Sequence, residues 1–378
     1  MAETRILTLN AGSSSLKLAL FAAVTGTPPR RVLSHAVTRI GSDVSDHAQA
    51  LHEALAWMDA HGGLGALAAI GHRVVHGGRL YTSSQPVTPE VLDELRRLAV
   101  LDPDHLPAEI AIIEAMGARS PSLAQVACFD TAFHRTMPRV ARLFPIPRRF
   151  AADGVERYGF HGLSYTYLTE ELARVGGERV ARGRVVMAHL GSGASLAALY
   201  DGRCVDTTMG FTPNSGIPMG TRSGDLDPGV VLHLLRTASF DANSLDHLLS
   251  RQSGLLGVSE TSADMRDLLA RQSTDSRAAD AVLLFCHHVR KAIGALAATL
   301  GGIETLVFSG GIGEKAASVR GQVARSLGHL GVELDEGRND ASSAIISSDA
   351  SECTVRVIHT DEESIIARET LRTIGGTP

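Results

Sequence analysis

The chain has 378 residues, of which 44% are hydrophobic and 20% are charged, and its formal net charge is -5. This length favours two domains, and the composition is typical of a globular protein rather than a disordered one. The negative net charge, and the absence of a polybasic block among the 36 Lys and Arg residues, argue against general nucleic-acid binding.

The cysteines and the amino-terminal residues indicate the compartment. Cys128, Cys204, Cys286 and Cys353 lie far apart and form no Cys-X-X-Cys pair, which favours reduced thiols and argues against a thiolate zinc site. The first residues show no signal-peptide pattern, and there is no run of about 18 apolar residues. We therefore expect a cytoplasmic protein with no membrane partner.

The first predicted elements are two short strands, Arg5–Leu9 and Leu18–Phe21, joined by the polar run Asn10-Ala-Gly-Ser-Ser-Ser-Leu-Lys17. The backbone N–H groups, serine hydroxyls and lysine cation of such a turn suit the β- and γ-phosphates of a nucleotide, and its asparagine oxygen suits a metal ion. The run is not a P-loop, because no helix follows it. An ordinary hairpin turn is the alternative interpretation.

Apolar stretches that alternate every second residue are interspersed with helical patterns, which predicts an α/β fold. Local start and stop signals predict several helices with defined ends. They are Pro89–Leu98 after Thr88, Val230–Leu235 after Asp227-Pro228, Arg277–Leu300 before Gly301-Gly302, and a last helix from a capping box at Thr360–Glu363 to about Thr373.

The stretch Ile6–Leu16 is weakly similar in sequence to Val185–Ser195. The apolar stretch Leu196–Tyr200 follows the second copy. A repeat this far apart predicts duplicated domains rather than a solenoid, with chance similarity as the alternative. Two domains that aim phosphate-binding hairpins at one nucleotide are the arrangement of the sugar kinase, Hsp70 and actin superfamily. We therefore expect two actin-like, ribonuclease H-like domains, residues 1–132 plus 364–378 and residues 133–363, with a nucleotide cleft between them.

Five further segments contain more polar residues and glycines than a segment that only packs in the hydrophobic core would. They are Gly71-His-Arg-Val-Val-His-Gly-Gly78, Phe129-Asp-Thr-Ala-Phe-His134, Tyr158-Gly-Phe-His-Gly162, Met219-Gly-Thr-Arg-Ser-Gly-Asp-Leu-Asp-Pro228 and Ser309-Gly-Gly-Ile-Gly-Glu314. With the first polar run, these motifs in this order resemble the acetate/propionate kinase family. The resemblance extends from Leu7 to about Arg368.

This resemblance implies reversible phosphoryl transfer between ATP and a short-chain carboxylate such as acetate, giving ADP and an acyl phosphate. It also implies Mg2+, for which Mn2+ can substitute, and a homodimer. The residue types suit this reaction, because a carboxylate nucleophile is already ionised at pH 7 and needs no general base. It needs positioning and relief from charge repulsion, which planar guanidinium groups provide.

The resemblance assigns the catalytic roles. Arg73 binds the substrate carboxylate, Arg222 binds the transferring phosphoryl group, and His161 donates a hydrogen bond to that group. Asp130 matches the family's essential aspartate, described as acid/base or as a magnesium residue, and we favour the magnesium role. Asn10 and Glu362 match magnesium positions and offer the oxygen ligands that this ion prefers. For Glu362, a complement to the helix dipole is the alternative.

The same resemblance assigns the binding residues. The nucleotide contacts are Ser13, Ser15, Lys17, His189, Leu190, Gly191, Ser192, Gly193, Asp264, Met265, Arg266, Gly311, Ile312, Gly313, Glu314 and Lys315. The acyl pocket consists of Arg73, Val75, His105, Phe160 and Pro213. A structural histidine is the alternative for His105.

Several residues depart from the family pattern. Asp104 stands where Leu usually lines the acyl pocket, and Leu106–Glu109 lacks the usual Asn/Pro-rich pattern. Other departures are Ser192 for Asn, Met265 for Phe, Lys315 for Asn, and Asn214–Gly216 for Leu-Glu-Gly. None removes a charged catalytic group. We expect Asp104 to point away from the pocket, in a turn whose Asp side chains bond the local backbone.

Three alternatives stay open. The first is a kinase of the same fold for propionate or a more polar short acid. The second is a non-catalytic nucleotide-binding or filament protein of the actin superfamily, which would have no use for a carboxylate clamp. The third is a pyrophosphate-dependent variant, although the Gly311-Ile312 turn favours adenosine.

Overall fold

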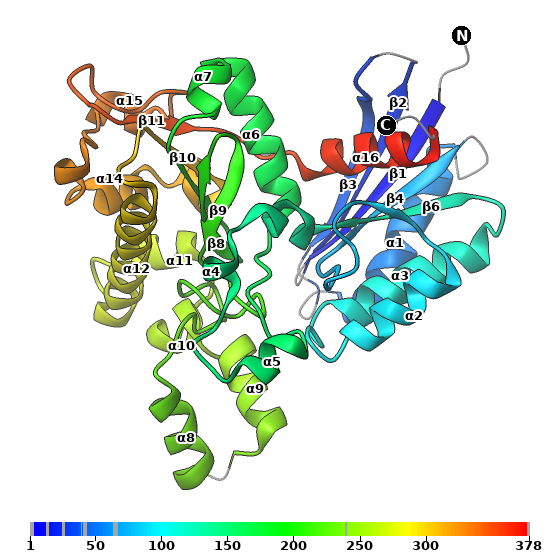
Figure 1. Ribbon diagram of the computed structural model, residues 1–378, viewed down its shortest axis with the longest axis horizontal. Helices are drawn as coiled ribbons and strands as arrows, with labels where there is room; N and C mark the ends of the chain where they lie inside the picture. Colours follow the sequence, from blue (N-terminus) through cyan, green and yellow to red (C-terminus); the bar gives the residue numbers. More distant parts are fainter. Residues whose placement is uncertain are drawn as a thin grey trace. The chain divides into compact units, whose positions relative to one another are not determined.

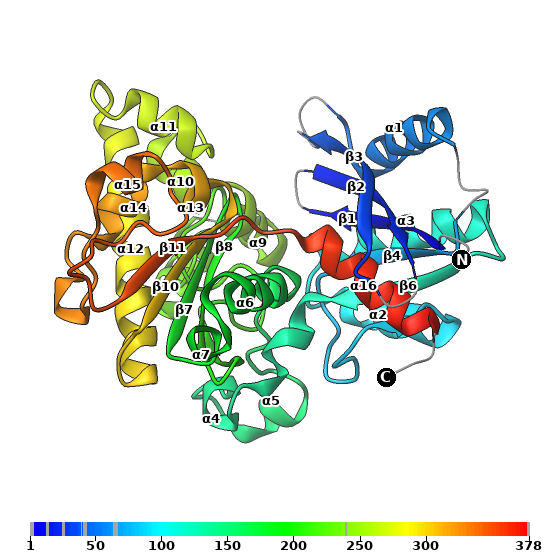
Figure 2. The same ribbon diagram turned by 90° about the horizontal axis from the view of Figure 1, so that it is seen from above.

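Two structural units share the chain in the computed structural model, which describes residues 4–12, 15–24, 27–38, 40, 44–62, 67–238 and 240–375 (Figures 1 and 2). The first unit contains Met1–Arg135, Phe160–Tyr167 and Asp361–Pro378. The second contains Thr136–Gly159 and Leu168–Thr360.

The first unit is built on a six-stranded sheet of order β3-β2-β1-β4-β6-β5. Its strands are β1 (Thr4–Ala11), β2 (Ser15–Ala23), β3 (Arg30–Thr38), β4 (Ala69–Val74), β5 (Gln85–Pro86) and β6 (Ala124–Phe129). The first three form an antiparallel meander, and β4 and β6 run parallel to β1. The carboxyl ends of β1, β4 and β6 therefore lie at one edge of the sheet.

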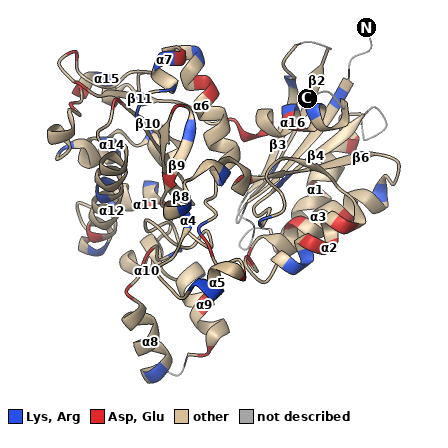
Figure 3. Ribbon diagram, in the orientation of Figure 1, with Lys and Arg blue, Asp and Glu red and all other residues tan. Residues whose placement is uncertain are grey.

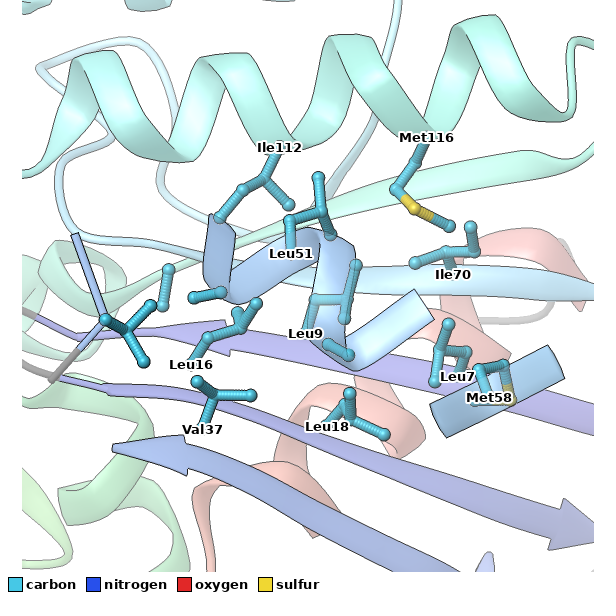
Figure 4. Packing of buried hydrophobic residues seen from close by; sticks show 14 residues of the cluster. Leu7, Leu9, Leu16, Leu18, Val37, Leu51, Met58, Ile70, Ile112 and Met116 are labelled. Carbon is cyan, nitrogen blue, oxygen red and sulfur yellow. The ribbon is translucent and has the colours of Figure 1, made fainter. Parts of the chain in front are cut away.

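Helices cover both faces of this sheet. They are α1 (His47–Ala60), α2 (Pro89–Leu98), α3 (Leu106–Arg119) and α16 (Glu362–Gly375). Helices α1 and α3 bury Leu51, Met58, Ile112 and Met116 against β1, β2 and β4 (Figure 4). Helix α16 covers the other face, where a Cβ added to Gly71 would lie 2.1 Å from Thr370 Oγ1. Such close packing requires glycine at this point of β4.

Basic and acidic residues are interspersed along α2 and α3 (Figure 3). Arg96 pairs with Asp93 and with Glu114 at 2.6 and 2.5 Å. These pairs are exposed, so each adds little stability. These two helices carry no positive field of the kind that attracts nucleic acid.

The second unit is built on a five-stranded sheet of order β11-β10-β7-β8-β9. Its strands are β7 (Val185–Leu190), β8 (Ala194–Tyr200), β9 (Arg203–Thr207), β10 (Thr305–Ser309) and β11 (Thr354–Val357). Strands β7, β8 and β9 form an antiparallel meander, and β10 and β11 are parallel to β7. Taken from β9 to β11, this strand order is equivalent to β3-β2-β1-β4-β6 of the first sheet. The two similar sequence stretches form the equivalent hairpins β1–β2 and β7–β8. The predicted α/β fold is confirmed.

Several helices lie wholly within the second unit. They are α4 (Arg139–Arg142), α5 (Arg148–Ala152), α7 (Glu178–Ala181), α8 (Pro228–Thr237), α9 (Ala242–Arg251), α10 (Gly254–Ser259), α11 (Met265–Arg271), α12 (Ser276–Leu300), α13 (Gly310–Lys315), α14 (Ala317–Ala324) and α15 (Glu336–Asp340). Helix α6 (Gly162–Gly176) begins in the first unit and ends in the second. Two short 3-10 segments, Asp130–Thr136 and Gly328–Leu330, complete the described elements.

Helix α12 is the only described helix whose length and apolar composition would allow it to cross a membrane. It packs against β8, α10 and α11. It buries Phe285, Val289 and Ile293 among other residues, as the core helix of a globular unit does.

For three of the four predicted helices, the predicted start or stop signals lie at the helix ends. Thr88 caps α2, Asp227 caps α8, and Gly301 ends α12 with a left-handed backbone. The predicted capping box at Thr360 is wrong. Helix α16 begins at Glu362, so the capping position is Asp361, whose side chain accepts the backbone N–H of Ser364. Glu363 accepts a hydrogen bond from Asn10.

Candidate active site

Asn10, Arg73 and Asp130 lie at the carboxyl ends of three parallel strands. Asn10 and Arg73 are the penultimate residues of β1 and β4, and Asp130 directly follows β6. Because β4 pairs with both β1 and β6, the three side chains meet at one edge of the first sheet. This edge is where ligands bind in many α/β proteins.

The Arg73 guanidinium forms a close ion pair with the Asp130 carboxylate. Its Nε and Nη2 donate to Asp130 Oδ2 at 3.0 and 2.6 Å, and its Nη1 donates to the Ala11 carbonyl at 2.8 Å. Asp130 is fully buried, whereas the Arg73 side chain is 10% exposed. Among the described residues, these bonds occupy three of the five N–H donors of the guanidinium, so two stay available to a ligand.

Acidic groups around this pair stabilise the charged form of Arg73. Burial alone would lower the pKa of Arg73, but Asp130, Glu362 and Glu109 outweigh it and raise that pKa above its ordinary value. Burial raises the pKa of the Asp130 carboxyl, the neighbouring Arg73 opposes this rise, and Glu362 adds to it. Arg73 is therefore a permanent cation at the edge of the sheet.

Glu362 lies beside Asn10, although the two are 352 residues apart in the chain. Asn10 Nδ2 donates to Glu362 Oε2 at 2.8 Å and to Glu363 Oε1 at 3.0 Å. Glu362 also lies close enough to Asp130 to raise the pKa of its carboxyl. Asn10, Asp130 and Glu362 are therefore brought together within the first unit, as the magnesium assignment requires.

The donor set of these residues suits a hard cation that keeps part of its water shell. No described group of three or more His, Cys, Asp or Glu residues has the arrangement of a complete protein cage for a metal. Two carboxylates and one carboxamide fit Mg2+, because this ion normally takes few protein ligands and completes its shell with water and phosphate oxygens.

Gly162, which follows Phe160 and His161 in the chain, packs directly on Asp130. A Cβ added to Gly162 would lie 1.8 Å from the Asp130 carbonyl oxygen, so only glycine allows the chain to pass there. His161 has a positive φ of 59°, an uncommon conformation outside glycine that is typical of functional turns. His134 Nε2 donates to the Phe160 carbonyl at 2.8 Å, and burial lowers the pKa of His134 to about 4, so this donor is a neutral imidazole.

Val75 and His105 each bond a different buried acid, and neither acid was assigned to the site from the sequence. The Val75 N–H donates to Glu109 Oε2 at 2.9 Å. The His105 backbone N–H and its Nδ1 both donate to Asp102 Oδ1, at 3.2 and 2.8 Å. This contact fixes the orientation of the imidazole. The only sequence signal for Glu109 was the departure of Leu106–Glu109 from the family pattern.

The predicted turn around Asp104 is confirmed for Asp102, whose side chain bonds the local backbone at His105. Asp104 itself is half-buried.

Glu109 is buried, and desolvation raises the pKa of its carboxyl to about 8, against the opposing effect of Arg73. An acidic group that holds its proton at neutral pH therefore lies beside the proposed acyl pocket.

The first polar run forms a β-hairpin, as predicted. The Gly12 N–H donates to the Ser15 carbonyl at 2.8 Å. Lys17 is exposed and pairs in register with Asn10, so the two side chains share one face of the sheet. Ser13 lies outside the described residues.

In the second unit, two glycine-rich segments lie side by side. Residues 191–193 connect β7 to β8, and Ser309 pairs with His189 of β7 in the parallel ladder. Gly310 has a φ of +74°, and a Cβ there would lie 2.7 Å from the Leu190 carbonyl oxygen. The start of α13 is thus packed directly on the last residue of β7, at the carboxyl ends of neighbouring parallel strands.

The loop that carries Arg222 contacts the same region. The Gly220 N–H donates to the Ser192 carbonyl at 3.0 Å, and a Cβ at Gly220 would lie 3.2 Å from the Ala263 carbonyl oxygen. Arg222 Nη1 donates to the Pro213 carbonyl at 3.3 Å. Arg222, Pro213 and the glycine-rich segments therefore gather in one part of the second unit.

The predicted nucleotide residues at α11 and α13 differ in exposure. Arg266 is exposed and forms an ion pair with Asp264, which caps α11. Met265 is buried in the core. Gly311 and Lys315 are exposed, whereas Gly313 is buried.

A separate cavity of about 1100 Å³ lies in the second unit. Its lining includes Arg184, Tyr200 and Leu300. Because Arg184 precedes β7, this cavity is at the end of the sheet opposite His189. None of the predicted site residues lines it.

Comparison with known proteins agrees with this arrangement. Residues 5–368 match the Acetokinase family. The chain is 45% identical over 394 aligned positions to an acetate kinase of Rhodopseudomonas palustris, with 98% of each chain covered. It is 38% identical to a propionate kinase of Yersinia enterocolitica, covering 97% of this chain and 96% of the relative. The crystal structure of Porphyromonas gingivalis acetate kinase matches with a TM-score of 0.85 and 32% identity, covering 98% of this chain and 100% of that one. The chain therefore belongs to the acetokinase family.

Proposed function

We propose that this protein catalyses reversible transfer of a phosphoryl group between ATP and acetate, giving ADP and acetyl phosphate, with Mg2+ or, in its place, Mn2+. As a member of the acetokinase family it is a phosphotransferase that acts on a carboxyl group. The observation that carries the assignment is the buried Arg73, which has two remaining N–H donors beside Asn10, Asp130 and Glu362.

The acyl substrate would bind at Arg73. Acetate is ionised at pH 7, so its carboxylate can accept the two N–H groups that Asp130 and Ala11 leave available. Val75, Phe160, His105 and Pro213 would surround the methyl group. No proton has to be removed from the nucleophile, which supports a metal-organising role for Asp130 rather than general acid/base catalysis.

The phosphoryl group would be held by Arg222 and His161 while it passes between the two oxygens. Charge neutralisation and in-line positioning account for most of the catalysis in such transfers. Asn10, Asp130 and Glu362 would hold the divalent ion, which supplies further charge neutralisation at the phosphates when it is bound. Arg73 keeps the carboxylate and Asp130 in fixed positions relative to each other.

The nucleotide would bind to the glycine-rich segments of the second unit and to the first hairpin. The residues assigned to it are Ser13, Ser15, Lys17, His189, Leu190, Gly191, Ser192, Gly193, Asp264, Met265, Arg266, Gly311, Ile312, Gly313, Glu314 and Lys315. We further propose that residues 1–132 plus 364–378 and residues 133–363 act as two actin-like domains, in a cytoplasmic homodimer.

Propionate is the second candidate acceptor, because the Yersinia enterocolitica relative is named a propionate kinase. ATP-dependent hydroxamate formation, measured in parallel with acetate, propionate and butyrate, tests both. We expect kcat/KM to be highest with acetate. A higher kcat/KM with propionate would make propionate, rather than acetate, the assigned substrate. If none of the three acids gave a product, the proposed reaction would be contradicted.

A further inference from the structure

The Glu314 carboxylate connects two segments of the second unit that are far apart in sequence. Its Oε1 accepts the Gly310 N–H at 3.0 Å, at the start of α13, and the Thr360 N–H at 3.2 Å. Its Oε2 accepts a hydrogen bond from His359 Nδ1 at 2.7 Å. One side chain therefore joins the proposed nucleotide segment to the chain that follows β11.

The other end of α13 is held by Arg320, which is fully buried. Its Nη1 donates to the carbonyls of Gly313 and Glu314 at 2.9 and 3.0 Å, and its Nε donates to Asn339 Oδ1 at 2.9 Å. Carbonyls at the carboxyl end of a helix need such donors. Helix α13 is thus fixed at both ends, and Glu314 is the residue that connects it to Thr360.

Thr360 occupies a special place in the chain. It is the last residue of the second unit, and Asp361 is the first residue of the final segment of the first unit. Glu362 follows and accepts the hydrogen bond from Asn10. Glu314 therefore bonds the backbone two residues before a proposed magnesium residue. Residues at a chain crossing between two units are where hinge motions are absorbed.

The contacts of Glu314 do not suit direct binding of a polyphosphate. A carboxylate repels phosphate charge, and both Glu314 oxygens accept hydrogen bonds from the protein's own backbone or from His359. Its side chain bonds Ser309 and Gly310 at the start of the glycine-rich segment, and His359 and Thr360 before the crossing.

We propose that Glu314 is a positioning residue that couples nucleotide binding at α13 to the placement of Glu362 at the metal site. The inference rests on the proposed function, because that function assigns α13 to the nucleotide and Glu362 to the metal. Such coupling is reciprocal: Mg2+ strengthens nucleotide binding by the same factor by which the nucleotide strengthens Mg2+ binding. Loss of the Glu314 contacts should reduce both together.

Glu314→Ala and Glu314→Gln in the full-length protein test this role. We expect Glu314→Ala to raise both the KM for ATP and the Mg2+ concentration for half-maximal activity by about tenfold, and to change the KM for acetate by less than about twofold. Glu314→Gln keeps an acceptor for the two backbone N–H groups and should stay within about threefold of the unsubstituted protein. Asp349→Ala, which breaks an exposed ion pair with Arg338 in the same unit, is the matched control and should change none of these values.

A double-mutant cycle with Glu362→Gln tests whether Glu314 acts on Mg2+ binding through Glu362 or independently of it. If Glu314 acts through Glu362, the two substitutions will be less than additive in their effect on Mg2+ half-saturation. Additive effects, or a rise in the KM for ATP without a change in Mg2+ half-saturation, would overturn the proposal. Equal losses in Glu314→Gln and Glu314→Ala would also overturn it, since they would show that the charge itself is needed.

Calorimetric titration with ATP, with and without Mg2+, gives a readout that does not depend on turnover. In the unsubstituted protein Mg2+ should tighten ATP binding, and Glu314→Ala should reduce this factor. If no acid is phosphorylated, the proposed function fails while the calorimetric test still decides the coupling. Should Glu314→Ala not fold, His359→Ala removes only the Oε2 contact and should show the same joint change at a smaller size; no joint change there would contradict the proposal.

Discussion

Arg73 and Asp130 form a buried ion pair in which two guanidinium nitrogens share one carboxylate oxygen, at 3.0 and 2.6 Å. This geometry binds one edge of the guanidinium and leaves donors on the other for a substrate. Arg73→Ala would leave Asp130 buried without its counter-ion, which typically costs about 3 to 5 kcal/mol of stability. We expect a higher KM for acetate together with a lower melting temperature. Asp130→Asn combined with Arg73→Ala should recover melting temperature but not the KM; an unchanged KM in both variants would contradict carboxylate binding by Arg73.

Arg222→Ala should lose most turnover while it retains ATP binding. An arginine that stabilises the transition state of phosphoryl transfer contributes about 10^3 to 10^5 in rate, or about 4 to 7 kcal/mol. Steady-state kcat and calorimetric ATP affinity measure the two effects separately. Arg266→Ala, at an exposed position of the same unit, is the comparison and should affect ATP affinity more than kcat. Retention of more than about a tenth of kcat, a loss below about 1.4 kcal/mol, would show that Arg222 does not have this role.

Glu362→Gln should raise the Mg2+ concentration for half-maximal activity, because the side chain lies beside Asn10 and close to Asp130. If Glu362 only complements the dipole of α16, the change would cost about 0.3 to 1 kcal/mol of stability and leave Mg2+ dependence unchanged. Glu90→Gln provides the control, since Glu90 is an acidic residue in the first turn of α2. The measurement is activity against Mg2+ concentration at saturating ATP.

Glu109 predicts a pH dependence of stability. Burial raises the pKa of its carboxyl from 4.5 to about 8 in the folded protein, so the folded state holds this proton more tightly than the unfolded state. The free energy of unfolding should therefore decrease as pH rises from about 4.5 to about 8, by at most about 5 kcal/mol at about 1.4 kcal/mol per pKa unit.

Glu109→Gln should remove this decrease, because the amide does not ionise. Urea unfolding at acid and alkaline pH measures the difference, and Glu114→Gln, at an exposed position of the same helix, is the control. An equal pH dependence in the unsubstituted protein and in Glu109→Gln would show that Glu109 is ionised in the folded state at neutral pH.

Asp104→Leu tests whether the acyl pocket is open to acetate. Two unit charges about 6 Å apart repel by about 2 to 3 kcal/mol at an effective dielectric constant near 20, so an Asp104 carboxylate that faced the pocket would weaken acetate binding considerably. Since we expect it to point away, the KM for acetate should change by less than about threefold, which is under about 1 kcal/mol. A tenfold fall in KM would place Asp104 in the pocket and favour a more polar substrate.

The helix boundaries show what local sequence is able to predict. Thr88, Asp227 and Gly301 act within a few residues of themselves, through caps and a left-handed backbone. The α/β pattern and the repeated hairpin also follow from spacing along the chain. The cap predicted at Thr360 lies one residue too early, because α16 begins after Asp361. Glu363 also has a distant partner, Asn10, which the local pattern does not contain.

The sequence by itself determined the α/β fold, the family motifs and the residue types available for the reaction, because these depend on short-range patterns. Only the tertiary structure decided which of those residues meet. Arg73 reaches Asp130 and Asn10 reaches Glu362 because parallel strands end at one edge of a sheet and α16 returns to it. The burial that changes the pKa of Glu109 and the connection of Glu314 to Thr360 also depend on packing between distant segments, which no spacing along the chain encodes.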